Sequence, residues 1–149
     1  MELNLKTILC PVDFSHDAVT ALDYAAAMAT QSHATLIVLH VVDNPLTEFY
    51  GPHGATFYAE VEHAIEKSKG LLAEAVRTHA PAVSCEIIVT HGKPYDEILE
   101  LASDKHADMI VMSTHGRSGP QRLIIGSVAE KVVRTAPCPV LTIRHGAHT

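Results

Sequence analysis

The residues best suited to bind an anion lie between Met112 and Val128, in the stretch Met-Ser-Thr-His-Gly-Arg-Ser-Gly-Pro-Gln-Arg-Leu-Ile-Ile-Gly-Ser-Val. The stretch begins where an apolar, strand-like run ends and finishes where a helix is expected to begin. Gly116 and Gly126 are separated by nine residues, and Ser127 follows. Backbone N–H groups of such a loop and of a helix N-terminus can donate to phosphate oxygens, and glycine lets the anion approach the chain. The stretch therefore predicts a phosphate-binding loop.

A purely structural interpretation of the same residues is also open. Ser127 and Glu130 have the spacing of a capping box, in which the serine side chain bonds the Glu130 N–H and the glutamate reaches back. Gly126 would then be a turn residue only. That interpretation leaves Gly116 and Arg117 unexplained, whereas a phosphate would use the glycine and a charge-assisted contact from the arginine.

Asp13 needs a separate explanation, because a carboxylate beside phosphates would repel them. It could hold Mg²⁺, or it could accept a hydrogen bond from a ribose hydroxyl. The alternative is a polar strand end that leads into a helix capped by Ser15. The local sequence does not separate these roles, and Asp13 is the candidate ligand for Mg²⁺.

Hydrophobic periodicity predicts strands that alternate with helices along the whole chain. The expected strands are Thr7–Val12, Thr35–Val42, Ser84–Val89, Asp108–Ser113 and Val140–Ile143. The expected helices are roughly His16–Gln31, Phe57–His79, Pro94–Asp104 and Ser127–Ala136. This alternation is typical of an α/β fold, a doubly wound five-stranded parallel sheet with helices on both faces.

The winding of such a sheet predicts where its ligand binds. Ligands lie outside the carboxyl ends of the strands, at the point where the winding reverses. If strands two and three extend to one side of strand one, and strands four and five to the other, that point lies between strands one and four. Asp13 and Ser113–Gly116 would meet there, although about a hundred residues separate them along the chain.

The composition of the chain limits the classes of function that it can have. The chain has 149 residues, 47% hydrophobic and 19% charged, which fits one domain spanning residues 1–149. A net charge of −6 argues against nucleic-acid binding. No apolar run reaches about 20 residues and the N-terminus lacks a signal-peptide pattern, so we expect no membrane partner. Three cysteines without a C-x-x-C motif favour the cytoplasm, and eleven scattered histidines are interpreted as solvated or capping residues.

The chain resembles the universal stress proteins over essentially its whole length. The matching pieces are Pro11–Ser15, His40–Val42, Gly92–Pro94, Met112–Arg117, Gly126–Val132 and Cys138–Leu141. The ATP-binding branch of the family has the pattern Gly-x-x-Gly, nine residues, Gly, then Ser or Thr. Gly116, Gly126 and Ser127 match its last three fixed positions, and Ser113 stands at the first. Serine keeps the backbone N–H, but it would be unfavourable if that position requires a positive φ.

The resemblance implies a Rossmann-like sheet of order 3-2-1-4-5, related to the adenine nucleotide alpha hydrolases. It also implies a site for ATP, AMP or ADP, with Mg²⁺ as a candidate companion ion. Residues around Pro11–Asp13 and Val41 would contact adenine and ribose, and Thr114–Ser118 with Gly126–Val128 would hold the phosphates. The expected nucleotide-binding residues are Pro11, Val12, Asp13, Val41, Met112, Ser113, Thr114, His115, Gly116, Arg117, Ser118, Gly126, Ser127 and Val128. Family members often form dimers through the last strand, here Val140–Ile143.

Two classes of function compete, a nucleotide-binding stress-response regulatory module and an enzyme. The chain lacks the Walker A lysine motif and the Ser-Gly-Gly loop of adenylating relatives. His40 and His115 could act as bases, but no second group is identifiably placed to orient either one. We therefore favour binding, with no catalytic residue assigned. A slow ATP hydrolase, and a dimeric scaffold that has lost nucleotide binding, are the alternatives.

The segment Asn44–Thr56 is rich in proline and glycine and is predicted to be a loop. Phe49 and Tyr50 could close over the adenine end of the site as a lid. A disordered crossover with incidental aromatic residues is the alternative.

Overall fold

The computed structural model of the chain describes residues 1–43, 54–115, 125–144 and 146, with the side chains of 54–56 left aside. Its strands and helices follow one another as β1 (Thr7–Pro11), α1 (His16–Ser32), β2 (Thr35–Val42), α3 (Gly54–His79), β3 (Cys85–His91), α4 (Pro94–Asp104), β4 (Met109–Ser113), α5 (Ser127–Thr135) and β5 (Val140–Ile143). The predicted alternation of strands and helices is confirmed.

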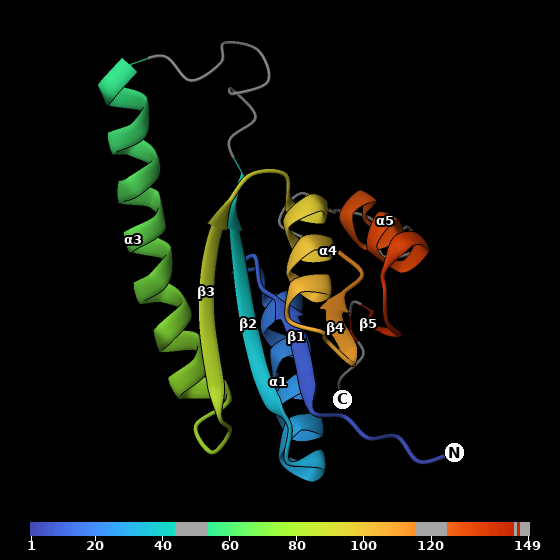
Figure 1. Ribbon diagram of the computed structural model, residues 1–149. Helices are drawn as coiled ribbons and strands as arrows, with labels where there is room; N and C mark the ends of the chain where they lie inside the picture. Colours follow the sequence, from blue (N-terminus) through green and yellow to red (C-terminus); the bar gives the residue numbers. More distant parts are fainter. Residues whose placement is uncertain (44–53, 116–124, 145, 147–149) are drawn as a thin grey trace.

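The five strands form one sheet in the order β3-β2-β1-β4-β5, and every neighbouring pair is parallel (Figure 1). The predicted fold class and strand order are therefore confirmed. β1 is central, and the chain leaves it first toward β3 and then, after α4, toward β5. The reversal of winding lies between β1 and β4, as the sequence predicts.

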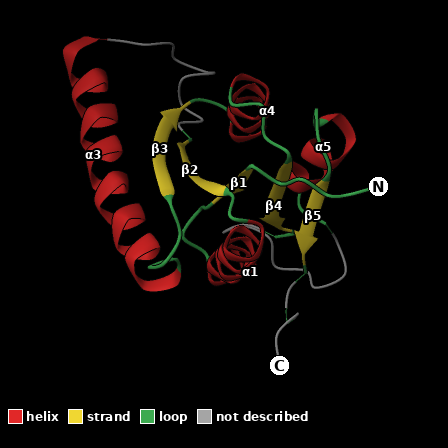
Figure 2. Ribbon diagram, turned by 60° about the horizontal axis from the view of Figure 1, so that its bottom comes forward, coloured by secondary structure: helices red, strands yellow, loops and turns green. Residues whose placement is uncertain are grey.

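Helices cover both faces of the sheet (Figure 2). Ile8 and Cys10 of β1 join the hydrophobic core beneath α1 and α3, whereas Leu9 joins the core beneath α4 and α5. This alternation follows from the two-residue period of a strand, and because both sides are buried the strands read as continuous apolar runs. The α1 side is packed with alanines such as Ala21 and Ala25, which are fully buried.

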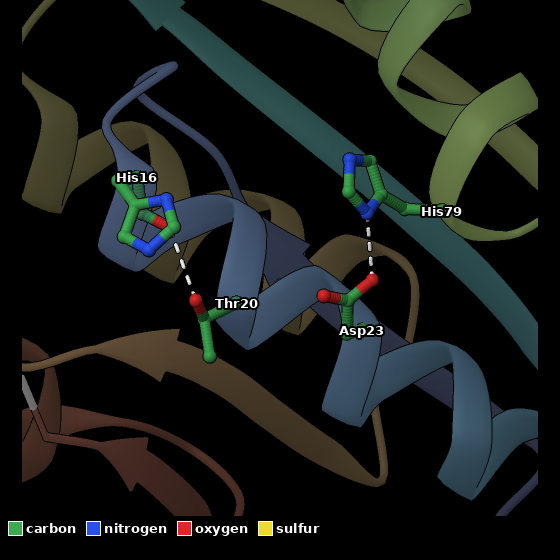
Figure 3. A network of polar contacts seen from close by, with 4 residues as sticks. All are labelled: His16, Thr20, Asp23 and His79. Carbon is green, nitrogen blue, oxygen red and sulfur yellow. Dashed lines mark hydrogen bonds and ion pairs between the residues drawn. The ribbon is translucent and has the colours of Figure 1, made fainter. Parts of the chain in front are cut away.

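An ion pair links the two helices on one face. His79, the last residue of α3, lies with Nδ1 2.7 Å from Oδ1 of Asp23 on α1 (Figure 3). One turn earlier on α1, the Thr20 hydroxyl donates to the His16 carbonyl at 3.2 Å (Figure 3). The Asp23 carboxylate is half-exposed, so this contact between the last residue of α3 and the middle of α1 contributes little to stability.

Two helix starts follow the sequence signals. Ser15 is the N-cap of α1, and its hydroxyl accepts a hydrogen bond from the Ala18 N–H at 3.2 Å. Pro94 is the first residue of α4, where its missing N–H costs nothing. Both starts were predicted from residue type alone.

Two sequence-based expectations are corrected. The N-cap of α5 is Gly126 and it has no side-chain cap, so the capping box of Ser127 and Glu130 is wrong: Ser127 is already helical. α3 begins at Gly54, so the last residues of the expected loop Asn44–Thr56 belong to the helix. The remainder of that loop, and with it the proposed lid, lies outside the described residues.

Within the part of the chain that the structure describes, no helix combines the length and the apolar character needed to cross a bilayer.

Candidate functional site

A cleft of about 520 Å³ lies at the carboxyl ends of β1, β2 and β4, where the winding of the sheet reverses. α4 contributes Pro94 and Ile98 to its wall, and the N-terminus of α5 closes another side. The expected site residues that line it are Pro11, Val12, Asp13, Val41, Met112, Ser113, Thr114, His115, Gly126, Ser127 and Val128. The remaining three, Gly116, Arg117 and Ser118, lie outside the described residues. The fold thus brings together residues from three distant parts of the sequence.

Asp13 shapes the turn that leaves β1. Its Oδ1 accepts hydrogen bonds from the Ser15 N–H at 3.0 Å and from the Ser15 hydroxyl at 2.5 Å. Between them Phe14 adopts a φ of 65°, a left-handed conformation that is uncommon outside glycine. Asp13 therefore has the structural role expected of a polar residue at the end of β1, because it organises the start of α1. The same carboxylate lines the cleft, so a contact with a ligand is compatible with it.

Ser113 ends β4 and is buried, with 9% of its surface exposed. Its hydroxyl donates to the His115 carbonyl at 2.7 Å and so holds the first turn of the loop. Among the described residues other than glycine, only Phe14, His33 and His106 have a positive φ. Ser113 therefore adopts ordinary backbone geometry, and serine at this position carries no conformational penalty.

Gly126 is required by crowding rather than by its own backbone angles. Its φ is −66°, but an added Cβ would lie 3.0 Å from the carbonyl oxygen of Thr114. The Gly126 N–H donates to that same oxygen at 2.6 Å, which ties the start of α5 to the loop after β4. The close approach fixes where the helix begins.

The N-terminus of α5 faces the cleft without a side-chain cap. The first N–H groups of a helix have no partner inside the helix, and the helix dipole makes this end favourable for negative charge. Ser127, Val128 and Ala129 all line the cleft at this end. The arrangement can accept an anion such as a phosphate group.

Sequence reasoning missed several lining residues. His40, Asp43 and Ser68 line the cleft, the last from α3. The sequence indicates His40 as a candidate base but not as part of the binding site, and nothing in the helical pattern around Ser68 marks that serine as a site residue. Of these three residues, His40 could have been identified from the sequence as a site residue, because it interrupts an otherwise apolar strand.

The interpretation of the histidines as solvated or capping residues needs correction at two positions. His33 is indeed the C-cap of α1. His115 is instead buried, 6% exposed, with Nδ1 2.9 Å from the Thr114 hydroxyl, and its buried Nε2 makes no hydrogen bond to any of the described residues. His40 bonds the Val12 carbonyl through Nδ1 at 2.6 Å. Both belong to the cleft wall.

The described residues contain no group of three or more His, Cys, Asp or Glu side chains that could hold a metal ion by themselves. Mg²⁺ does not need such a group, since it commonly binds one or two carboxylates together with substrate phosphates. Asp13 and Asp43 are the carboxylates that line the cleft.

Comparison with known proteins identifies the family. The sequence model of the universal stress protein family matches residues 4–144. The chain belongs to the universal stress protein family. A Staphylococcus aureus (strain USA300) protein assigned to the universal stress proteins is 34% identical over 143 residues, which cover 95% of this chain and 86% of that protein.

Solved universal stress proteins share the fold. The protein UspA from Lactobacillus plantarum has a TM-score of 0.72 and 30% identity, covering 96% of this chain and 100% of that one. A universal stress protein solved in complex with cAMP has a TM-score of 0.66 and 23% identity, covering 95% and 98%. One from Archaeoglobus fulgidus, in complex with dAMP, has a TM-score of 0.61 and 20% identity, covering 96% and 100%.

Proposed function

We propose that this universal stress protein is an adenine-nucleotide-binding regulatory module for the stress response. The observation that carries the proposal is the uncapped N-terminus of α5, which faces a cleft at the winding reversal of the sheet. The complexes of two relatives with cAMP and dAMP support the same ligand class. ATP is the expected ligand, with AMP and ADP as the alternatives.

The phosphates would lie at the end of the cleft formed by α5 and β4, against Gly126–Val128 and Thr114–Ser118. The nucleoside would extend across Pro11–Asp13 toward Val41 at the end of β2. The partly exposed side chains of Val41 and Val42 make that end of the cleft apolar, which suits the faces of a purine.

Mg²⁺ would enter this site together with the phosphates, with Asp13 and Asp43 as the carboxylates within the cleft wall. Asp13 already uses one oxygen to hold Ser15. The protein would therefore supply few of the ligands, and the ion would neutralise phosphate charge beside the carboxylate.

Binding, rather than fast hydrolysis, is the proposed activity. Among the described residues, the hydrogen bonds of His40 and His115 go to the Val12 carbonyl and the Thr114 hydroxyl, and no carboxylate orients either ring. General-base catalysis needs such an orienting group and a positioned water. A slow ATP hydrolase, or a scaffold that has lost nucleotide binding, is the competing function.

We further propose a homodimer formed through β5, and a cytoplasmic location with no nucleic-acid or membrane partner. β5 ends the sheet in the described structure, so one side of its backbone is available to a second copy. The free thiols of Cys10, Cys85 and Cys138 agree with a reducing compartment.

Mass spectrometry of freshly purified, denatured protein, followed by calorimetric titration with ATP and AMP, tests the proposal. Co-purified adenine nucleotide and saturable binding support it. No binding of any adenine nucleotide overturns it and favours the scaffold. ADP in the protein, with steady release of phosphate from added ATP, would instead favour the hydrolase.

A further inference from the structure

β3 (Cys85–His91) is an outer strand of the sheet, and in the described structure it pairs with β2 alone (Figure 1). Its seven residues are in continuous register with Leu36–Val42, without a bulge. Proteins commonly protect an outer strand with prolines, lysines, bulges or a short length, because an open edge is a template for another strand. β3 has none of these features and is rich in β-branched residues, which favour strand pairing. Its outer edge is therefore suited to accept a further strand.

The hydrogen bonds to β2 fix the direction of the β3 backbone. The Leu36 N–H donates to the Ser84 carbonyl at 2.9 Å, and beyond the other end of β3 the Gly92 N–H donates to the Val42 carbonyl at 3.1 Å. Backbone groups alternate between the two sides of a strand, so the even-numbered residues of β3 face β2. The N–H and C=O groups that point away from the sheet make no hydrogen bond to any residue in the described ranges, and they belong to Cys85, Ile87, Val89 and His91.

Side-chain burial differs between β3 and its neighbour β2. Ile87 and Val89 of β3 pack on the same hydrophobic core as Leu36 and Val38 of β2. Leu36 and Val38 are fully buried, whereas the two β3 side chains are partly exposed, although α3 packs on both strands. β2 has a neighbouring strand on each side and β3 has one, which accounts for the difference. A strand added at this edge would cover the exposed apolar surface.

The carboxyl end of this edge carries a poorly compensated negative charge. Glu97 of α4 lies over Gly92, the residue that follows β3, and a Cβ added to this glycine would lie 3.0 Å from Oε1. Burial raises the pKa of Glu97, and the neighbouring Glu100 and Asp96 raise it further, while His91 lowers it in part. A cation placed beside the Glu97 carboxylate would therefore stabilise its charged form.

The charges favour a different protein over a second copy of this chain as the partner of the edge. Each copy carries a net charge of −6. Besides its histidine, β3 holds one ionisable acidic residue, Glu86, whose Oε1 already lies 2.9 Å from Nζ of Lys105. A β3 strand from a second copy would thus bring no lysine or arginine to Glu97. An extended segment with apolar side chains on one face and a lysine or arginine near one end would do so, and it would also bond the outward backbone groups.

We propose that the outer edge of β3 is a docking site for an extended, basic segment of another protein, which adds to the sheet as a further strand. Backbone hydrogen bonds to β3 provide the affinity, and contact of a lysine or arginine with Glu97 provides the selectivity. The residues of β3 are absent from the lining of the cleft, so the proposal does not depend on nucleotide binding.

The probe is the peptide Lys-Val-Thr-Val-Thr-Val-Lys, acetylated and amidated at its ends, whose sequence is the same in both directions. Its valines lie on one face of the extended chain, and its threonines and lysines lie on the other. ¹H–¹⁵N spectra of the full chain give both the affinity and the site. We expect saturable shifts of the Ile87 and Val89 amides, and affinity about tenfold or more above that of the peptide with glutamates in place of the lysines.

Two methylated forms of the peptide test whether it binds as a strand. N-methylation of the three valines removes N–H groups from one side of the extended backbone, and N-methylation of the two threonines removes them from the other side. Only one side of an added strand bonds β3, so one form should bind about tenfold more weakly than the other.

Two variants of the protein test the edge itself. Ile87→Pro removes an outward N–H and keeps the pairing with β2, so it should weaken binding of the lysine peptide by about fivefold or more, with Ile87→Val as the matched control. Glu97→Gln should weaken it by about threefold, with Glu60→Gln on the exposed face of α3 as the control. Circular dichroism checks each fold, and Glu97→Gln with the methylated peptides decides the matter if Ile87→Pro does not fold.

Several results would overturn the proposal. These are the absence of saturable binding of the lysine peptide, equal affinities of the two methylated forms, and wild-type affinity in Glu97→Gln or in folded Ile87→Pro. Shifts of the Ile87 and Val89 amides that depend on protein concentration, and that the peptide does not reverse, would assign the edge to a second copy instead. ATP titration of the same samples keeps the two proposals apart, since either one can fail while the other stands.

Discussion

At the scale of single residues, Gly126 combines a structural demand with a role at the anion-binding end. Gly126→Ala is expected to weaken ATP binding by about tenfold and to lower the free energy of unfolding by about 1 kcal/mol. The physical reason is that the new Cβ would lie 3.0 Å from the Thr114 carbonyl oxygen, which must shift and move the start of α5. Titration calorimetry and urea denaturation measure the two effects.

Gly70→Ala is the matched control for this change. Gly70 lies within α3, and an added Cβ there meets nothing within 4 Å. Alanine should raise the free energy of unfolding by roughly 0.5–1 kcal/mol, through helix propensity, and leave ATP affinity unchanged. Wild-type affinity in Gly126→Ala would show that the close contact with Thr114 does not set the binding geometry.

Ser113 gives the second residue-scale prediction. Since Ser113 has ordinary backbone angles and its hydroxyl holds the His115 carbonyl at 2.7 Å, glycine should not improve the site. Ser113→Gly is expected to lose about 1 kcal/mol of stability, from the lost hydrogen bond and the greater freedom of the unfolded chain. ATP affinity should stay within about twofold of wild type or fall. A tenfold tighter complex would instead mean that the serine side chain obstructs the ligand.

At the scale of elements, the start of α4 carries an electrostatic cost. Burial raises the pKa of Glu97 above its usual range, and the neighbouring Glu100 and Asp96 raise it further, while His91 lowers it in part. A carboxyl group whose folded pKa is raised binds protons better in the folded protein, so stability falls as pH rises through that range. The charged form of Glu97 therefore weighs against folding at neutral pH.

Glu97→Gln should accordingly raise the melting temperature at neutral pH. The gain should vanish near pH 3, roughly a unit below the ordinary glutamate pKa, because the wild-type side chain is then neutral as well. Thermal melts at both pH values measure the effect, with Glu60→Gln on the exposed face of α3 as the control. A gain that persists in acid would point to a packing effect of the amide rather than to charge.

The element scale also shows what the sequence could and could not predict. β2 and β5 were predicted to the residue, because buried parallel strands give nearly continuous apolar runs with clear ends. The start of α5 at Ser127 was predicted, but the alternative of a capping box formed by Ser127 and Glu130 is wrong, since that residue pattern occurs whether or not the serine caps. The capping geometry depends on the contact between Gly126 and Thr114, which lies between residues twelve positions apart and has no local signature.

The residues of the candidate site were likewise predicted only in part from the sequence. The resemblance and the winding rule together predicted the residues from β1, β4 and α5 that line the cleft. Ser68 and Ile98 reach the cleft from other helices, and their positions depend on how those helices pack over the sheet. Such lining residues are set by tertiary packing, and hydrophobic periodicity identifies only the face on which they lie.

At the scale of the whole molecule, the cleft and the open edge of the sheet are connected by backbone hydrogen bonds. The Gly126 N–H donates to the Thr114 carbonyl at 2.6 Å, and the Thr114 N–H donates to the Ile143 carbonyl of β5 at 3.0 Å. A displacement of the start of α5 by a bound phosphate would act on the end of β5 through these two bonds. These two hydrogen bonds offer a physical route by which nucleotide binding in the cleft would affect the proposed dimer interface at β5.

The direction of the β5 backbone identifies a residue that tests the dimer. The Ile110 N–H donates to the Pro139 carbonyl, and the Thr114 N–H donates to the Ile143 carbonyl. The backbone N–H and C=O groups of the odd-numbered residues of β5 are therefore directed toward β4. Backbone groups alternate sides along a strand, which leaves those of Val140 and Thr142 directed to the open edge. Thr142→Pro would remove an outward N–H and keep the pairing with β4.

We expect Thr142→Pro to be a monomer and Thr142→Val, which keeps the N–H and the strand propensity, to remain a dimer. Sedimentation equilibrium gives the mass of each, and circular dichroism shows whether the fold survives. Because the proposed cleft lies at the strand ends and not on the β5 edge, the monomeric variant should still bind ATP. A dimer that persists in Thr142→Pro would show that the two copies meet through another surface, and the link from Thr114 to the interface would fail with it.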